Sequence, residues 1–328
     1  MGNVDLSVNL GGLAMRTPVT TASGTFGYGA EYAGAVDYSK LGAVTVKGVR
    51  LDPWPGNPMP RHVEVPGGLV NAIGLQGPGV DAFLSHHVAE YLDSVGAGID
   101  AESIPPMIVN IWGGSIEEYA EVASRISSFA LPQNSRFSTH NPQFPIGAIE
   151  MNVSCPNVKA GGHTFGQDTK VLFDVVRAVR ASTKLPLIVK LAPNVPSIVP
   201  YVKACEDAGA DALALINTIP AMVIDIETRR PVLGNLTGGL SGRCVHPAAV
   251  KVIYDAHKAS RLPILAMGGI YEAKDAIEFF LAGATAVAVG TALFTDPNVP
   301  AEVCDGIADY CERHGFSSVK DLVGALES

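Results

Sequence analysis

The chain has 328 residues, 47% of them hydrophobic and 17% charged, with a formal net charge of −9 at pH 7. This composition is typical of a globular protein with a large core, and the lack of a basic run argues against nucleic acid as a partner. No stretch approaches the roughly 18 consecutive apolar residues of a membrane helix, and the first residues lack a signal-peptide pattern. We therefore expect a cytoplasmic protein without a membrane anchor.

Eight short apolar segments read as strands, and most are followed by a helical pattern. Most are continuous apolar runs, as in strands that are buried on both faces of a parallel sheet. Residues 170–182, capped by Asp168, and 248–260, begun by Pro247, are the clearest helices; residues 272–281 and 300–312 are further candidates. The expected strands are residues 18–23, 43–47, 107–111, 148–154, 187–192, 212–217, 263–268 and 286–290.

An internal repeat refines this α/β prediction. Residues 184–190 lead through a helix to 208–217, and residues 261–267 lead through a helix to 282–290. Each copy is a strand, a helix, an Ala-Gly-Ala turn and a second strand. Two βαβ units with one pattern favour a (β/α)8 barrel over an open sheet, and the length suits one barrel domain over residues 1–328.

Two segments interrupt the alternation of strands and helices, and we interpret them as inserted loops at about 51–79 and 131–146. The first follows the second expected strand, so it should cover the catalytic face of a barrel. The second leads into a strand, so it should lie on the opposite face.

Polar residues collect at the carboxyl ends of the expected strands, which form one ring around one pocket in a barrel. A lysine on an apolar strand is costly unless it meets an anion or an electron-rich ring; a lysine that extends to solvent is the alternative. Cys155, at a strand-to-loop junction, is either reactive or a buried structural cysteine. The ring contains Ser23, Lys47, Asn110, Asn152, Cys155, Lys190, Asn217, Thr218, Gly268, Gly269, Gly290 and Thr291.

The uncharged members of this ring suggest two kinds of ligand group. Gly268, Gly269 and Gly290 end the last two strands, where backbone N–H groups can approach a phosphate; a third glycine cluster, at 238–242, lies in an expected loop. Amide and hydroxyl groups suit the amide and carbonyl edge of a heterocycle. They are supplied by Asn152, Asn217, Thr218 and Asn71, although Asn71 could equally be a turn residue.

The five cysteines are scattered, odd in number and without a C-x-x-C pair. This pattern predicts reduced thiols and argues against a disulfide framework or a zinc site, so no metal is expected. An iron–sulfur cluster needs about four clustered thiolates. Any such cluster would therefore lie on a partner.

Several long motifs together resemble the dihydroorotate dehydrogenase family, over about residues 6–291. The resemblance implies a (β/α)8 barrel that binds one FMN at its carboxyl-terminal face and oxidises dihydroorotate to orotate in de novo pyrimidine biosynthesis. The motifs are Ala22-Ser-Gly-Thr-Phe-Gly-Tyr-Gly29, Val46-Lys-Gly48, Gly56-Asn-Pro-Met-Pro-Arg61, Asn71-Ala-Ile-Gly-Leu75, Asn152-Val-Ser-Cys-Pro-Asn-Val-Lys-Ala-Gly-Gly162 and Gly239-Leu-Ser-Gly242.

The same resemblance indicates a subclass. A cysteine at the position of Cys155 is similar to the cytosolic class, since membrane-associated members use serine. The Asn-Val-Lys-Ala-Gly-Gly stretch that ends at Gly162 resembles the NAD-linked branch, called class 1B. That branch implies a homodimer within a heterotetramer, whose electron-transfer subunit carries FAD and a 2Fe-2S cluster. The chain departs from the family at Gly77, commonly Asn, and in longer segments near 98–106 and 133–145.

The resemblance also implies residue roles. Cys155 would be the general base and Lys190 would stabilise the reduced flavin. FMN would contact Ser23, Lys47, Gly48, Asn110, Asn152, Lys190, Ile216, Gly242, Gly268, Gly269, Gly290 and Thr291. The substrate would contact Lys47, Asn71, Ala72, Ile73, Gly74, Leu75, Asn152, Asn217 and Thr218.

Three alternatives stay open at this point. One is a fumarate-linked (class 1A) dihydroorotate dehydrogenase, and another is a flavin reductase like dihydropyrimidine dehydrogenase, which needs no cation for a carboxylate. The third is a flavin-free barrel, such as an isomerase or a lysine-dependent aldolase, that binds a phosphorylated metabolite.

Overall fold

The computed structural model describes residues 4–97, 99–131, 135, 137, 144–154 and 166–327. Its main feature is a sheet of eight parallel strands in the order β3-β16-β15-β10-β9-β8-β7-β4. Each expected strand segment supplies one of them. The strands are β3 (Val19–Thr21), β4 (Val44–Val49), β7 (Met107–Ile111), β8 (Ile146–Asn152), β9 (Leu187–Lys190), β10 (Ala212–Leu215), β15 (Ile264–Met267) and β16 (Ala286–Val289).

Hydrogen bonds between the two edge strands close this sheet into a barrel. The backbone N–H of Thr45 on β4 donates to Thr21 Oγ1 on β3 at 3.0 Å, and that hydroxyl donates to the Thr45 carbonyl at 3.2 Å. Just before β4, the N–H of Gly42 donates to the Val19 carbonyl at 2.8 Å. The predicted (β/α)8 barrel is therefore confirmed.

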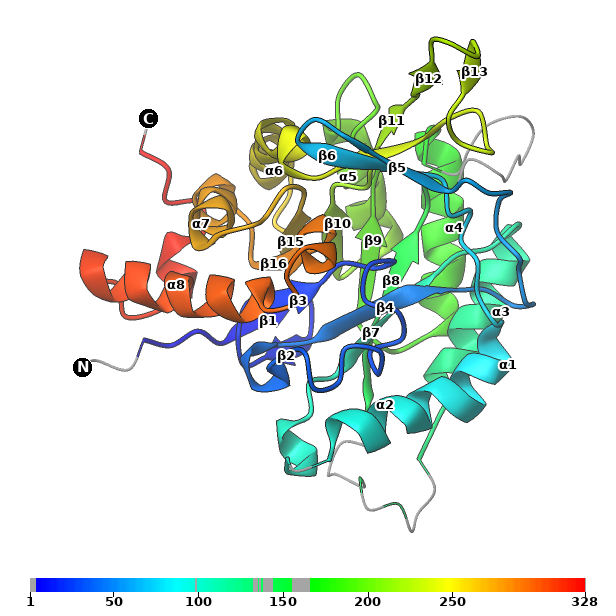
Figure 1. The fold of residues 1–328 in the computed structure, drawn as a ribbon. Coiled ribbons are helices and arrows are strands. Elements are labelled where there is room, and N and C mark those ends of the chain that lie inside the picture. Colours follow the sequence, from blue (N-terminus) through cyan, green and yellow to red (C-terminus); the bar gives the residue numbers. More distant parts are fainter. Residues whose placement is uncertain are drawn as a thin grey trace.

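Helices lie around the outside of the strands (Figure 1). A short π-helical segment, η2 (Phe83–His87), joins α1 (Val80–Ala82) to α2 (Val88–Val95). The other helices are α3 (Ile116–Ser127), α4 (Thr169–Ser182), α5 (Val199–Ala208), α6 (His246–Ala259), α7 (Ala273–Ala282) and α8 (Val299–His314). Short 3₁₀ turns are η1 (Tyr38–Lys40), η3 (Ala101–Ser103), η4 (Arg243–Val245), η5 (Thr291–Phe294) and η6 (Val319–Leu322). Within the described ranges, no helix is long and apolar enough to cross a membrane.

Local sequence explains where these helices begin and end. The Asp168 carboxylate accepts hydrogen bonds from the first N–H groups of α4, as its capping position predicted. The Ala-Gly-Ala turns of the internal repeat end α5 and α7. Their glycines, Gly209 and Gly283, have φ values of +93° and +116°, a left-handed conformation that glycine adopts without strain.

A second, four-stranded antiparallel sheet differs from the sequence prediction. Its order is β11-β14-β6-β5, and its strands come from the expected loops at 51–79 and 238–242 and from the chain after β10. Strands this short show no clear hydrophobic periodicity in the sequence. They form because the barrel brings distant segments together, where they can pair. Figure 1 shows this sheet beyond the end of the barrel where β10 leads into β11. The strands are β5 (His62–Val65), β6 (Gly68–Asn71), β11 (Ile219–Ala221) and β14 (Gly238–Ser241), and β12 (Ile224–Asp225) pairs with β13 (Arg230–Pro231) beside them.

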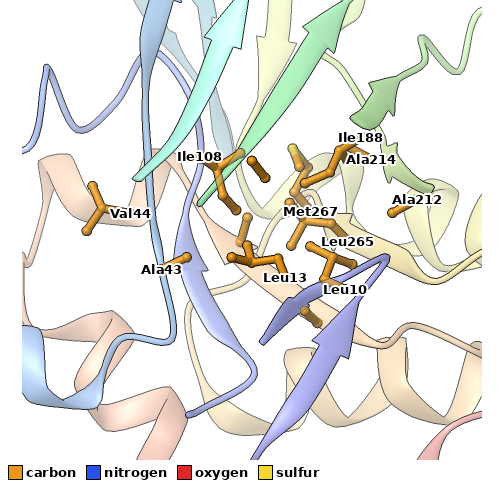
Figure 2. Packing of buried hydrophobic residues seen from close by; sticks show 14 of the residues in the cluster. Leu10, Leu13, Ala43, Val44, Ile108, Ile188, Ala212, Ala214, Leu265 and Met267 are labelled. Atoms are coloured by element: carbon orange, nitrogen blue, oxygen red, sulfur yellow. The ribbon is translucent and has the colours of Figure 1, made fainter. Parts of the chain in front are cut away.

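The opposite end of the barrel is closed by a hairpin of β1 (Val8–Leu10) and β2 (Leu13–Met15). Its turn lies against the starts of the barrel strands, with Gly11 beside Asp211. Figure 2 shows Leu10 and Leu13 among buried side chains of the barrel strands. Most of the second expected loop, 131–146, lies outside the described residues, so its predicted position on this face stays a prediction.

Shortening a buried side chain of the β1–β2 hairpin should destabilise the fold without changing the other end of the barrel. Leu10 is completely buried, and replacing such a leucine by alanine leaves a cavity that costs about 2–5 kcal/mol of unfolding free energy. We expect Leu10→Ala to lose this amount in urea denaturation. Asn9→Ala, at an exposed position of the same strand, is the control: it loses one exposed hydrogen bond, from the Gly12 N–H, and should change stability far less. Equal losses in the two variants would contradict the assigned role of Leu10.

Candidate active site at the carboxyl ends of the barrel strands

A buried polar cluster lies at the carboxyl ends of three neighbouring strands. Lys190, the last residue of β9, is 4% exposed, and its ammonium donates to Ser23 Oγ at 3.0 Å. It also lies 3.4 Å from Glu150 Oε1 on β8. The same carboxylate oxygen accepts a hydrogen bond of 2.6 Å from Asn110 Nδ2 on β7. The structure therefore brings together three predicted site residues: the Glu150 carboxylate joins Asn110 to Lys190, and Lys190 in turn contacts Ser23.

Glu150 itself was missed, because the sequence reading treated residues 148–154 as an apolar strand. The available signal was a charged residue two positions before Asn152, which places both side chains on the same face of β8. Trp112, directly after β7, was also missed. Its buried indole N–H has no hydrogen-bond partner among the described residues, and it lies close to Gly48: a Cβ added to that glycine would be 3.0 Å from Trp112 Cδ1.

A second group gathers the predicted amide and hydroxyl residues. Asn217 Nδ2 donates to Asn152 Oδ1 at 3.1 Å, and the adjacent Thr218 hydroxyl lies against Gly239 of β14. Gly239 pairs with Asn71 of β6, whose side-chain amide donates to the Gly239 carbonyl at 3.4 Å. The small sheet thus brings Asn71 to the side chains at the ends of β8 and β10.

The segment that follows Asn71 is held by hydrogen bonds to Asn57 and to Arg61, whose carbonyl accepts from the Ala72 N–H at 2.7 Å. Asn57 Nδ2 donates to the Ala72 carbonyl at 3.1 Å, and the Asn57 N–H donates to the Ile73 carbonyl at 3.1 Å. Gly74 has a φ of +75°, and a Cβ there would be 2.5 Å from Asn57. Leu75 follows with a positive φ of 58°. Residues 71–75 therefore have a shape that depends on Asn57 and on a glycine at position 74.

The predicted glycines form a cradle at the ends of β15 and β16. Gly269 has a φ of +75°, and a Cβ added to it would be 2.9 Å from the Gly242 carbonyl. Gly268 lies beside Ile216, whose N–H donates to the Met267 carbonyl at 3.1 Å. Near them, Thr291 Oγ1 donates to Ser241 Oγ at 2.8 Å. Backbone packed this closely leaves no room for side chains and suits the approach of a phosphate.

Lys47 differs from Lys190 in its surroundings. It lies on β4 and is half-buried, and its ammonium forms no hydrogen bond or ion pair with any residue in the described ranges. Burial lowers the pKa of Lys47 below the ordinary lysine value, and the nearby Arg61 lowers the pKa further, whereas Glu31 opposes the shift. This half-buried cation is suited to an anionic ligand.

Cys155, the predicted base, lies outside the described residues, as do residues 156–165 after it. Ser154, the residue before it in the chain, has a buried Oγ without a hydrogen-bond partner among the described residues. A cavity of about 650 Å³ lies at the other end of the barrel, lined by the starts of β8 and β9 and by the β1–β2 hairpin. It contains none of the predicted site residues, so we place the candidate site at the carboxyl ends.

Fold and site together define a (β/α)8 barrel with a cradle of closely packed glycines, a group of amide side chains and two lysines at the carboxyl ends of its strands, the end at which barrel enzymes have their active sites. A family model described as "Dihydroorotate dehydrogenase" matches residues 5–310. The chain belongs to the dihydroorotate dehydrogenase family.

Curated relatives match over almost the whole length. The chain is 47% identical over 326 residues to a protein of Geotalea uraniireducens, with 99% of each chain covered. It is 49% identical over 323 residues to one of Pelobacter propionicus, covering 98% of this chain and 99% of the relative. A protein of Geobacter sp. is 48% identical over 327 residues, with complete coverage of both. All three are named "Dihydroorotate dehydrogenase B (NAD(+)), catalytic subunit".

Proposed function

We propose that this chain is the FMN-binding catalytic subunit of an NAD-linked dihydroorotate dehydrogenase, which oxidises dihydroorotate to orotate in pyrimidine biosynthesis. The observation that carries the proposal is the buried Lys190 beside Ser23 at the carboxyl end of a family-matched barrel. The names of the relatives favour the NAD-linked class over the fumarate-linked one. An accessory subunit with FAD and a 2Fe-2S cluster would relay the electrons, and the catalytic chains would form a homodimer within a heterotetramer.

The described residues fit FMN at both ends of that molecule. The glycine cradle at Gly242, Gly268, Gly269 and Gly290 has the close backbone that a phosphate needs. At the other end, two groups can donate to a polar heterocycle: the Lys190 ammonium and the Trp112 indole N–H, which has no hydrogen-bond partner among the described residues. When bound, FMN supplies the chemistry of accepting a hydride.

The reaction removes two hydrogens from neighbouring carbons. Carbon five would lose a proton to a base, for which we propose Cys155, and FMN, when bound, would supply the acceptor for the hydride that leaves carbon six. The electron pair of the C5–H bond becomes the new carbon–carbon double bond of orotate. Asn71, Asn152, Asn217 and Thr218 would orient the ring through its amide and carbonyl groups, and Lys190 would stabilise negative charge on the reduced cofactor.

Lys47 would recognise the carboxylate of the substrate, because its ammonium has no partner among the described residues. A hydrogen bond to a charged group is worth about 1.5–3 kcal/mol, so Lys47→Met should raise the KM for dihydroorotate about 10- to 150-fold. The pKa of Lys47 is lowered, so Lys47 loses its proton at a lower pH than an ordinary lysine does. Binding of dihydroorotate should therefore begin to weaken at that lower pH. KM measured across pH checks both effects. Asn235→Met, at an exposed loop position, should change neither.

The glycine cradle gives a prediction with a matched control. Gly269→Ala places a Cβ 2.8 Å from His246 Cβ at a φ of +75°, so we expect at least tenfold weaker FMN retention, measured as flavin content after dialysis. Gly315→Ala has nearly the same backbone strain, at φ +76°, with nothing within 4 Å. It should keep its flavin. Loss of FMN from both variants would assign the effect to strain alone.

Anaerobic reduction of the purified chain by dihydroorotate, followed at the flavin absorbance, tests the whole proposal. Bleaching supports FMN and substrate together, and NAD, fumarate and quinone, each added with the accessory subunit present or absent, then identify the acceptor. A yellow protein whose flavin is not bleached by dihydroorotate would favour the dihydropyrimidine dehydrogenase-like alternative. A chain that cannot take up FMN would favour a flavin-free barrel.

A further inference from the structure

Glu150 is a carboxylate at the mouth of the barrel for which the proposed reaction has no role. It is 0% exposed and lies on β8, paired with Asn110 of β7 on one side and Ile188 of β9 on the other. Oε1 accepts the hydrogen bond from Asn110 and contacts the Lys190 ammonium. Oε2 is buried and has no hydrogen-bond partner among the described residues.

Stability does not explain such a group. Taking a carboxylate and an ammonium out of water costs more than their mutual attraction returns unless the geometry is excellent. Here the Lys190 Nζ to Glu150 Oε1 distance is 3.4 Å, and the other carboxylate oxygen has no hydrogen-bond partner in the described part of the chain. A pair of apolar residues of similar volume would fill this position at no such cost. The pair therefore calls for a functional reason.

The position of the pair suggests that reason. The Lys190 ammonium has three donors, of which Ser23 and Glu150 take two. The two partners come from different parts of the barrel, Ser23 from just after β3 and Glu150 from β8, so together they fix the direction of the remaining donor. Because both side chains of the ion pair are at most 5% exposed, water screens little of either charge. The charge of the carboxylate therefore interacts electrostatically with any ligand of Lys190 as well as with Lys190 itself.

We propose that Glu150 is a positioning residue that holds the Lys190 ammonium against the flavin and, through its own charge, lowers the reduction potential of bound FMN. The inference rests on the proposed function. Reduced flavin carries the additional negative charge, so a fixed anion nearby disfavours that form, while Lys190 favours it. A lower potential suits a flavin whose electrons finally pass to NAD, which is a weak oxidant.

The test is the midpoint potential of the FMN-loaded Glu150→Gln protein, from anaerobic titration against a reference dye. Removal of the charge should increase the affinity for reduced FMN relative to oxidised FMN at least tenfold, a positive shift of about 30 mV for a two-electron couple. Glu150→Met, which needs no hydrogen bonds, should shift the potential in the same direction and keeps the test open if the glutamine variant does not fold. Glu150→Asp retains the charge and should keep the affinity ratio within about twofold of the wild type.

A structural role would give a different result. Loss of stability or of flavin content in all three variants, with the potential of the remaining bound FMN unchanged, would overturn the inference. So would an equal shift in the aspartate and glutamine variants. If wild-type protein binds FMN and dihydroorotate reduces it, such results reject this inference alone. A wild-type protein without FMN would reject the proposed function instead.

Discussion

Replacing Cys155 by serine is expected to slow the reduction of bound FMN by dihydroorotate about 10²- to 10⁴-fold, the usual contribution of a general base. A serine hydroxyl holds its proton far more tightly than a thiol of ordinary pKa near 8.5, so it is the poorer base unless the site activates it. The cofactor should stay bound, because the cradle and Lys190 are unchanged. Stopped-flow absorbance of the oxidised flavin under anaerobic conditions measures the rate directly.

The pH dependence and a second cysteine complete this experiment. If the thiolate of Cys155 is the base, the wild-type rate should rise toward alkaline pH. Cys244, an exposed cysteine, provides the control, and Cys244→Ser should leave both the rate and its pH profile unchanged. A Cys155→Ser protein that reacts at the wild-type rate would remove this thiol from the mechanism.

Lys190→Ala is expected to lose both flavin and stability. The substitution leaves the completely buried Glu150 carboxylate without its cation, and breaking a buried ion pair from one side costs about 3–5 kcal/mol. It also removes the donor beside Ser23 that FMN would contact. Flavin content after purification and the free energy of unfolding in urea report the two losses separately.

A lysine just before the start of β9, the strand that ends at Lys190, provides the matched control for Lys190→Ala. Lys184 is exposed and precedes β9, so Lys184→Ala should stay within about 0.5 kcal/mol of wild-type stability and keep its flavin. Adding Glu150→Ala to Lys190→Ala should restore part of the lost stability, because the unpaired charge is gone. A Lys190→Ala protein with normal stability and flavin would contradict the assigned place of Lys190.

Local chemistry made much of the barrel predictable. Most strands of the barrel lie in short, largely apolar runs, and such runs are typical of strands buried on both faces of a covered parallel sheet. The Ala-Gly-Ala turns mark helix ends because Gly209 and Gly283 adopt a left-handed conformation. Asp168 marked the start of α4 for an equally local reason, since its side chain accepts hydrogen bonds from that helix.

The small sheet could not be predicted in the same way. Asn71 and Gly239 are partners in the β6–β14 ladder although they lie far apart in the chain. Neither segment has a clear apolar period of its own. The β14 segment is rich in glycine and the chain leading into β6 contains proline and glycine, residues that normally indicate loops. Their pairing depends on the barrel, because the carboxyl ends of β4 and β10, from which the two segments continue, lie at the same end of it.

The sequence by itself determined the fold class, the family resemblance and most of the polar residues at the strand ends, although not Glu150, because these follow from residue type and order. Only the tertiary structure decided which of them touch. It placed Glu150 between Asn110 and Lys190 and left Lys47 without a partner among the described residues. The physical reason is that buried electrostatics depends on distances between strands, and a linear pattern contains residue types but not those distances.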